Sequence, residues 1–159
     1  MKISCEICDI INSDNNDVII DQSLGWRVVL MENQGLLGAV FITAVDHHQA
    51  LGDLSDKQWL GLRNLVRELE AAISQSFHPV YFNFACDMND AAREGKPTHV
   101  HFKLRPRYSS AVKAGNEIFT DPGFGTKKIE PHKVDSNTLR LIRDRIMQRF
   151  DQKQIKIVR

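Results

Sequence analysis

Four polar side chains recur at alternate positions of the stretch HVHFKLRPRY: His99, His101, Lys103 and Arg105. Alternate residues of a β-strand share one face, so these side chains would point at one place. A neutral imidazole can attack phosphorus, because its ordinary pKa of about 6.5 leaves it largely unprotonated near neutral pH. Neighbouring cations would stabilise the charge of the transition state. The stretch indicates phosphoryl-transfer chemistry, although the solvent face of an ordinary strand also carries polar residues.

A second group of residues has the spacing of metal ligands. Cys5 and Cys8 stand in CEIC, where a two-residue gap places two soft ligands on one turn. A tetrahedral zinc site would need two more ligands, and the candidates are His47, His48 and His99. The three cysteines are an odd number, which favours a metal site over a disulfide in a reducing compartment. Two small buried cysteines would show the same spacing, so both interpretations stay open at this point.

Size and charge limit the remaining possibilities. The chain has 159 residues, 42% of them hydrophobic, which suffices for one domain, residues 1–159, with a single core. Its 21 Lys and Arg against 20 Asp and Glu give a formal charge of +1, so no surface-wide field favours a polyanion or a membrane. The N-terminus lacks the pattern of a secretory signal, and no segment has the length of a membrane span. We therefore expect a cytoplasmic protein.

The hydrophobic pattern predicts the elements that position these residues. Two β-branched runs, 26–31 and 39–45, flank a glycine-containing turn and predict a hairpin. Ser55 and Gln58 form a capping-box signature, and apolar residues then recur at helical spacing as far as Phe77. Each signal lies within a short stretch of the sequence, so it predicts its element without information from a distant segment.

Further along the chain, residues 80–87 and 99–105 are predicted strands, separated by a segment rich in loop formers. Residues 109–134 are expected to form an irregular extension that packs on the body or covers the site. A second amphipathic helix is predicted at residues 135–151. Strands on both sides of a helix, followed by a final helix, predict an α+β fold with an antiparallel sheet.

Several of these stretches, in one order, resemble the histidine triad family of nucleotide hydrolases and transferases. The family's C-x-x-C-x-I-I is similar to CEICDII, and its glycine, apolar strand and histidine are similar to GAVFITAVDHH. Its leucine-serine-acid helix start resembles LGDLSD, and its signature H-x-H-x-H with a following P-R pair resembles HVHFKLRPRY. The resemblance covers about two thirds of the chain, and the joint order is more specific than any single motif.

The resemblance implies a five-stranded antiparallel sheet with two main helices and a homodimer. It implies that His101 is the nucleophile, which forms a covalent nucleotidyl-histidine intermediate, with His99 and the residue at position 103 beside it. The implied substrates are nucleoside phosphoramidates, dinucleoside polyphosphates and adenylated compounds. The CxxC-bearing branch implies a structural, redox-inactive Zn²⁺ held by four residues, with His47 preferred to His48 by counting back from LSD: Cys5, Cys8, His47 and His99.

Three positions depart from the family's pattern. Lys103 replaces the third histidine, and a lysine keeps a donor and a charge but loses a base that works near neutral pH. The loop residue beside the phosphate aligns with Asp87 or Asn89, and we prefer Asn89 because a carboxylate repels phosphate.

The third departure concerns the substrate contacts around the first hairpin. The family's ribose-binding Asp or Asn position falls on Met31, which leaves Leu30 and Glu32 as the implied nucleoside contacts. Arg105 is the implied additional contact to the substrate. The base that the site would prefer is therefore not defined by the resemblance.

Three functions compete with the hydrolase or transferase. Lys103 is compatible with a nucleotide-binding or regulatory module that has weak or no turnover. The histidines could also be purely structural in a small zinc-stabilised domain. A role on nucleic acid has no independent support, because the charge is balanced and no basic tail is present.

Overall fold

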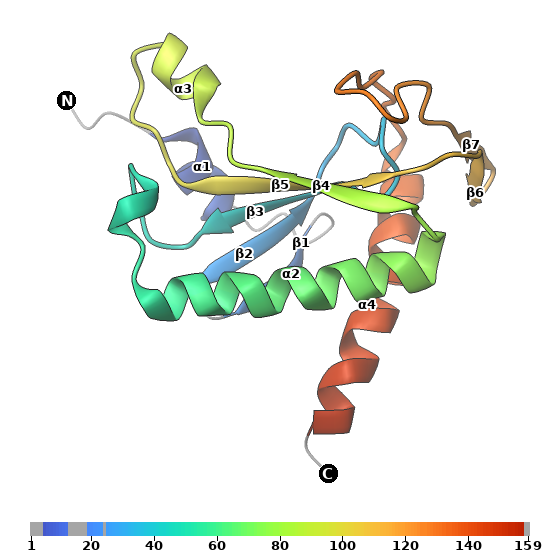
Figure 1. Cartoon of the computed structure of the whole chain (residues 1–159), viewed down its shortest axis with the longest axis horizontal. Coiled ribbons are helices and arrows are strands. Elements are labelled where there is room, and N and C mark those ends of the chain that lie inside the picture. Colours follow the sequence, from blue (N-terminus) through green and yellow to red (C-terminus); the bar gives the residue numbers. More distant parts are fainter. Residues whose placement is uncertain (1–4, 13–18, 24, 158–159) are drawn as a thin grey trace.

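The computed structural model describes residues 5–12, 19–23 and 25–157. Its main sheet has five strands: β1 (Ile19–Ser23), β2 (Trp26–Leu30), β3 (Val40–Ala44), β4 (Tyr81–Ala85) and β5 (His101–Arg107). The strand order is β1-β2-β3-β5-β4, and every neighbouring pair is antiparallel. The predicted α+β fold with a five-stranded antiparallel sheet is therefore confirmed, with the histidine-bearing β5 inside the sheet and β4 at its edge (Figure 1).

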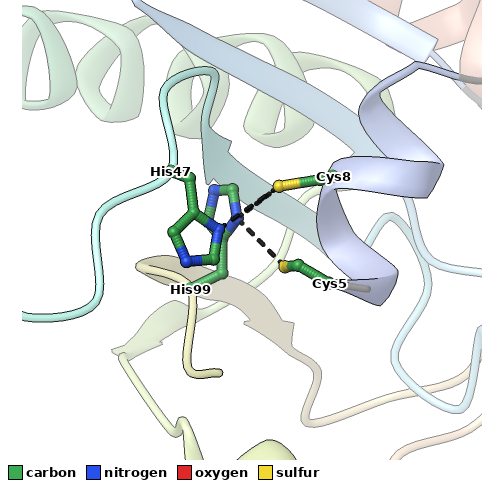
Figure 2. A group of neighbouring side chains, drawn as sticks. All are labelled: Cys5, Cys8, His47 and His99. Atoms are coloured by element: carbon green, nitrogen blue, oxygen red, sulfur yellow. Dashed lines mark hydrogen bonds between the residues drawn. The ribbon is translucent and has the colours of Figure 1, made fainter. Parts of the chain in front are cut away.

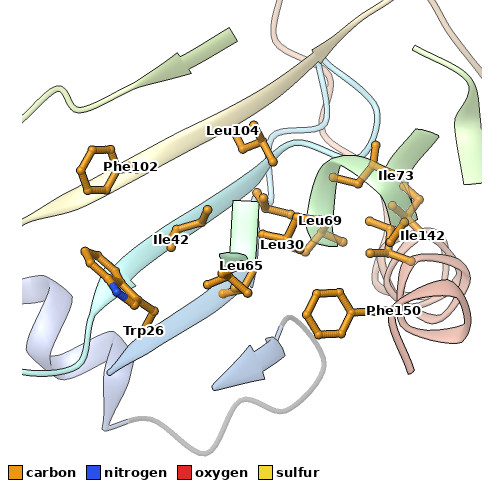
Figure 3. Close-up of a cluster of buried hydrophobic side chains, with 14 of the residues drawn as sticks. Trp26, Leu30, Ile42, Leu65, Leu69, Ile73, Phe102, Leu104, Ile142 and Phe150 are labelled. Carbon is orange, nitrogen blue, oxygen red and sulfur yellow. The ribbon is translucent and has the colours of Figure 1, made fainter. Parts of the chain in front are cut away.

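Two long helices complete the core: α2 (Asp56–Phe77) and α4 (Ser136–Ile157). The predicted capping box starts α2, because Ser55 Oγ accepts from the Gln58 amide and Gln58 Oε1 accepts from the Ser55 amide. The helix ends at His78, whose φ of 56° lies in the left-handed region. Its apolar face packs with strand residues and with α4, and Figure 3 shows part of this cluster: Trp26, Leu30, Ile42, Leu65, Leu69, Ile73, Phe102, Leu104, Ile142 and Phe150.

Two short helices lie beside the chemistry-bearing segments: α1 (Glu6–Ile11) and α3 (Asn89–Arg93). No residue of α1 is buried, so core packing contributes little to holding this helix in place. A 3₁₀ helix η1 (Leu51–Asp53) precedes α2. The segment predicted as a plain loop between the strands thus contains a helical turn, α3.

The extension after β5 contains a small hairpin made of β6 (Val112–Ala114) and β7 (Glu117–Phe119). Arg107 at the end of β5 fixes the following FTDPGFG loop through two bonds to Asp121, of 2.7 and 2.9 Å. The same guanidinium donates to the backbone carbonyls of Gly123 and Thr126. The extension therefore packs on the body of the protein. Among the described residues, no helix is both long and apolar enough to cross a bilayer.

Candidate functional site

Strand β5 and the residues just before it carry apolar side chains on one face and polar side chains on the other. Val100 and Leu104 are fully buried on the face that meets the core. His99 and His101 belong to the opposite face, yet they are only 1% and 8% exposed. The predicted alternation is therefore present, but the histidine face is not an ordinary solvent face. Burying two imidazoles costs free energy unless their nitrogens have partners, so their hydrogen bonds define the site.

The imidazole of His101 is held in one tautomer. Its Nδ1 lies 2.8 Å from the backbone carbonyl of His99, and because a carbonyl only accepts, Nδ1 is the protonated nitrogen. Phe41 of β3 stacks on the ring with centroids 4.5 Å apart. Burial lowers the pKa of His101, and the charge of Lys103 acts in the same direction. His101 therefore has a neutral ring with a lone pair on Nε2, the form that a phosphorus nucleophile needs.

Two cations follow His101 on the same face of β5. Lys103 and Arg105 approach the carboxylate of Asp87 at 3.9 and 3.7 Å. Asp87 lies just after β4, whose last residue, Ala85, pairs with Lys103 across the sheet. Lys103 and Asp87 line the same pocket as His101, whereas Arg105 lines a separate pocket with Met31 and Asn33. Lys103 can bind one anionic phosphoryl group in the His101 pocket if that group shares or displaces Asp87.

A pocket extends from His101 toward two short helices. Its wall from α1 includes Ile7 and Ile10, and its wall from α3 includes Ala91. Lys96, in the segment after α3, forms an ion pair with Glu6 of α1 and so joins the two walls. Phe41 and these helices were not singled out in the sequence, because their contribution depends on long-range packing. A six-residue helix with no buried residue leaves no hydrophobic pattern to detect.

The proposed metal ligands lie together beside this pocket. Figure 2 shows the side chains of Cys5, Cys8, His47 and His99 grouped together. One ligand atom from each of the four lies within 4.8 Å of the others. Three sulfur-to-nitrogen distances are 3.3, 3.4 and 3.5 Å. Tetrahedral Zn²⁺ with ordinary Zn–S and Zn–N bonds places such atoms about 3.5 Å apart. The donor set and its spacing therefore fit zinc.

The protonation of the cluster also suits a cation. His99 Nε2 lies 2.8 Å from the carbonyl of Ala44, so Nε2 carries the proton and Nδ1 is free to ligate. Burial, together with the neighbouring Cys5, raises the pKa of Cys8 to about 11. Two thiolates this close would repel each other, and a bound cation removes that repulsion. The cluster is thus preorganised for a soft divalent metal.

Comparisons with solved structures place this geometry among known folds. A hypothetical histidine triad nucleotide-binding protein from Sulfolobus tokodaii superposes with a TM-score of 0.72 at 15% identity, over 96% of each chain. The chain has the histidine triad fold. No protein-family model and no curated protein matches the sequence. At this identity the likeness establishes the fold alone.

Two further solved structures are similar. A Zn-bound family protein from Mycobacterium smegmatis matches with a TM-score of 0.62 at 18% identity, covering 94% of this chain and 97% of that one. Diadenosine triphosphate hydrolase from Plasmodium falciparum, in complex with Cyclomarin A, matches with a TM-score of 0.61 at 14% identity. That match covers 87% of this chain and 80% of the hydrolase.

The histidine triad fold brings some of the implied residues to the site and leaves others away from it. His47 lies in the metal cluster, whereas His48 lies 2.9 Å from the side-chain amide of Gln58. Leu30 is 1% exposed in the hydrophobic core and does not line the pocket. Glu32 is exposed and does not line the pocket.

The loop after β4 contains both candidates for the phosphate contact, Asp87 and Asn89. Asn89 is exposed at the first position of α3 and lies outside the pocket lining, whereas Asp87 lines the pocket. The preference for Asn89 rested on repulsion between a carboxylate and phosphate. The ion pairs of Asp87 with Lys103 and Arg105 offset that repulsion, so the geometry favours Asp87.

Proposed function

We propose that this chain is a nucleotide phosphohydrolase or nucleotidyl transferase that works through a covalent nucleotidyl-histidine. The observation that carries the proposal is the state of the His101 ring. Its Nδ1 donates a hydrogen bond to the carbonyl of His99, which leaves a lone pair on Nε2. His101 lines the pocket. Lys103 lines the same pocket and supplies positive charge there, and Arg105 shares the partner of Lys103, Asp87. Structures with the same fold include a nucleotide-binding protein and a diadenosine triphosphate hydrolase, which supports nucleotide chemistry.

The proposed reaction has two displacements at one phosphorus atom. Nε2 of His101 attacks the α-phosphorus, the bond to the leaving group breaks, and the leaving atom takes a proton from solvent. A water molecule, or another acceptor hydroxyl in a transferase, then attacks the phosphorus. The phosphorus–nitrogen bond breaks, its electron pair returns to Nε2, and the attacking oxygen releases its proton. Lys103 stabilises the charge in both steps.

The proposed metal is a structural Zn²⁺. Cys5, Cys8, His47 and His99 would hold it, and the metal would supply a cross-link between the segment at α1, the β3–α2 connection and the start of β5. This cross-link would keep α1 in place as a pocket wall, because α1 has no buried residue of its own. His101 is not in the cluster, so its role as nucleophile does not depend on ligation.

A homodimer is the proposed assembly, and the edge strand β4 is the surface that suits it. Phe84 of β4 is 43% exposed, and Leu60 and Trp59 on the neighbouring α2 are 56% and 40% exposed. An apolar edge strand has free backbone donors and acceptors that a second copy could pair. A self-complementary contact of this kind gives a closed twofold dimer.

One specific observation favours a second function, a binding or regulatory module with little turnover. Lys103 stands where the resembling family has a histidine, and its partner Asp87 reduces the net charge at the phosphate position. Calorimetric titration with AMP, combined with the Lys103→His exchange, separates the two functions. A wild type that binds AMP, does not hydrolyse, and gains turnover on exchange supports the module. A wild type that hydrolyses well and is only impaired by the exchange contradicts it.

The direct activity test compares wild type with His101→Ala on adenosine phosphoramidate and on diadenosine tetraphosphate. We expect hydrolysis by wild type and its loss in the variant. His78→Asn is a matched control, because His78 is exposed at the end of α2 and Asn tolerates its left-handed conformation. Equal rates for wild type and His101→Ala would refute the assignment.

A further inference from the structure

A second pocket lies farther along the face of β5 that carries His101. Its volume is about 190 Å³, and it is lined by Met31, Asn33, Leu36, Ala39, Arg105 and Ile129. Four of these residues belong to the connection between β2 and β3, and Ile129 belongs to the extension between β7 and α4. The pocket therefore lies where β5, the β2–β3 connection and the extension meet (Figure 1).

Hydrogen bonds hold the walls of this pocket in place. The fully buried side chain of Gln34 donates to the carbonyls of Met31 and Ala39, at 2.6 and 3.3 Å. The amide of His132 donates to Asn33 Oδ1 at 2.9 Å, and the His132 carbonyl accepts from the Gln34 amide at 2.8 Å. The extension is thereby fixed to the β2–β3 connection, so the space exists before a ligand arrives.

The polar side chains that line the pocket offer donors. Oδ1 of Asn33 already accepts from two backbone amides, so the side-chain nitrogen of Asn33 is the group left for a ligand. Arg105 has only donors. The carbonyls of Met31 and Ala39 are engaged by Gln34, and no carboxylate of the described residues lines this pocket. The lining therefore suits a ligand that accepts hydrogen bonds and carries negative charge.

The guanidinium of Arg105 has most of its donors unused. Its side chain is only 21% exposed, and its ion-pair partner in the described part of the chain is Asp87, whose Oδ2 lies 3.7 Å away. That distance exceeds a hydrogen bond. Arg107, two residues further along β5, instead donates four hydrogen bonds. Removing a guanidinium from water without hydrogen bonds costs free energy, so Arg105 marks a place for a ligand.

We propose that this pocket binds a small carboxylate whose charged end pairs with Arg105 and whose apolar body contacts Met31, Leu36 and Ile129. A planar guanidinium binds both oxygens of a carboxylate through parallel N–H donors. A phosphate dianion fits less well, because the nearby Asp87 reduces the positive charge available. A space of about 190 Å³ equals about six water molecules, which suits a compact body such as one ring.

Asp87 connects the carboxylate site with the His101 pocket. The same oxygen, Oδ2, lies 3.9 Å from Lys103 Nζ and 3.7 Å from Arg105. A carboxylate on Arg105 neutralises that guanidinium, so Asp87 pairs more closely with Lys103 and leaves less positive charge for a phosphoryl group. We expect the two ligands to weaken each other's binding by one common factor, about fivefold. This coupling rests on the proposed function, whereas the carboxylate site does not.

Titration of the full chain with benzoate, followed through the backbone amide signals in NMR spectra, tests the site. Benzamide has the same shape without the charge, and acetate has the charge without the ring. We expect benzoate to bind with a millimolar or lower dissociation constant, and benzamide and acetate to bind about tenfold more weakly. Signals of residues 31–39, 105 and 129 should shift. Benzoate binding no tighter than that of benzamide, or absent at millimolar concentrations, would overturn the inference.

Phenyl phosphate tests the assigned class of anion. We expect its dissociation constant in this pocket, followed through the same amide signals, to be higher than that of benzoate. A lower value for phenyl phosphate would contradict the carboxylate assignment.

The variant Arg105→Met removes the guanidinium but keeps a long unbranched side chain. We expect the dissociation constant of benzoate to rise about tenfold and that of benzamide to stay unchanged. Lys113→Met is the control, because Lys113 is exposed on β6 and does not line the pocket. Arg105→Lys keeps the charge without the planar fork and should lose part of the affinity, which maintains the test if Arg105→Met does not fold. Wild-type affinity for benzoate in the variants at position 105 would overturn the inference.

The coupling is measured by calorimetric titration with AMP in the absence and presence of saturating benzoate. We expect the dissociation constant of AMP to rise about fivefold with benzoate in wild type and to change much less in Asp87→Asn. An unchanged value in wild type would refute the coupling. If AMP does not bind at all, the proposed phosphoryl site fails, and the benzoate titrations decide the carboxylate site independently.

Discussion

The backbone carbonyl of His99 accepts a hydrogen bond from Nδ1 of His101 over 2.8 Å. His99 is at the same time one of the four proposed metal ligands, and its own Nε2 is fixed by the carbonyl of Ala44. His99 therefore connects the proposed metal cluster with the hydrogen bond that orients the proposed nucleophile. Supporting bonds of this kind commonly determine how well a reactive group is positioned.

Metal content is the first prediction. Purified without a chelator, the wild type should contain about one equivalent of zinc by elemental analysis, as a closed Cys₂His₂ site requires. Cys8→Ser should lose most of it, because Cys8 lies 3.3 Å from His47 and 3.5 Å from His99. Cys86→Ser is the control, since Cys86 is outside the cluster. Less than half an equivalent in wild type would count against the site.

Removal of the metal should weaken substrate binding more than it slows chemistry. The helix α1 supplies Ile7 and Ile10 to the pocket but has no buried residue, so the cluster is its main attachment. After chelation we expect KM for adenosine phosphoramidate to rise severalfold with a smaller change in kcat, and limited proteolysis to cut near α1. An unchanged KM and unchanged resistance to proteolysis near α1 in fully demetallated protein would contradict this attachment.

Phosphate binding should depend on Lys103. Lys103→Ala removes the cation that follows His101 on β5 and lines the same pocket, and we expect the dissociation constant for AMP to rise about tenfold, equivalent to about 1.4 kcal/mol. Calorimetric titration measures this change. Lys113→Ala is the matched control, because Lys113 is exposed on β6 and does not line the pocket. Equal affinities for wild type and Lys103→Ala would remove Lys103 from the phosphate site.

The buried pair of Arg107 and Asp121 should be important for stability. Both side chains are almost fully buried, and their Nε-to-Oδ2 distance is 2.7 Å. Arg107→Ala leaves an uncompensated carboxylate in the interior, so we expect the free energy of unfolding to fall by about 3–5 kcal/mol. Urea denaturation checks this value. Arg93→Ala breaks the exposed pair with Asp90 and should cost less than about 1 kcal/mol. Similar losses of unfolding free energy in both variants would contradict the expected contribution of the buried pair.

The proposed dimer predicts an effect at the edge strand. Phe84→Lys places a charge on β4 and should shift the protein toward monomer in sedimentation velocity, because an edge charge blocks strand pairing. Ile118→Lys is the control, since Ile118 is 64% exposed but belongs to β7, away from β4. A wild type that is monomeric at high concentration, or a Phe84→Lys dimer as stable as wild type, would exclude this surface.

The parts of the fold that the sequence predicted have strong local signals. The capping box at Ser55 marks the start of α2, and the alternation around His101 marks β5. The metal ligands were predicted from spacing and family resemblance together. The structure shows that His99 and His101 are buried, which alternation alone does not reveal, because covering elements come from distant parts of the chain.

Two of the implied site residues lie outside the pocket for a common physical reason. Leu30 and Asn89 were assigned by counting along loops and strand ends, where one inserted residue changes the direction of a side chain. The ion pair of Lys96 with Glu6 joins segments 90 residues apart, and no local pattern encodes such a contact.

The covalent intermediate tests the central claim most directly. Wild type is mixed with adenosine phosphoramidate, quenched in alkali within milliseconds to seconds to preserve the phosphorus–nitrogen bond, and mapped by mass spectrometry. The peptide that contains His101 should gain the mass of one adenylyl group, and His101→Ala should carry none. Turnover by wild type without this adduct, or with the adenylyl group on another residue, would contradict the account.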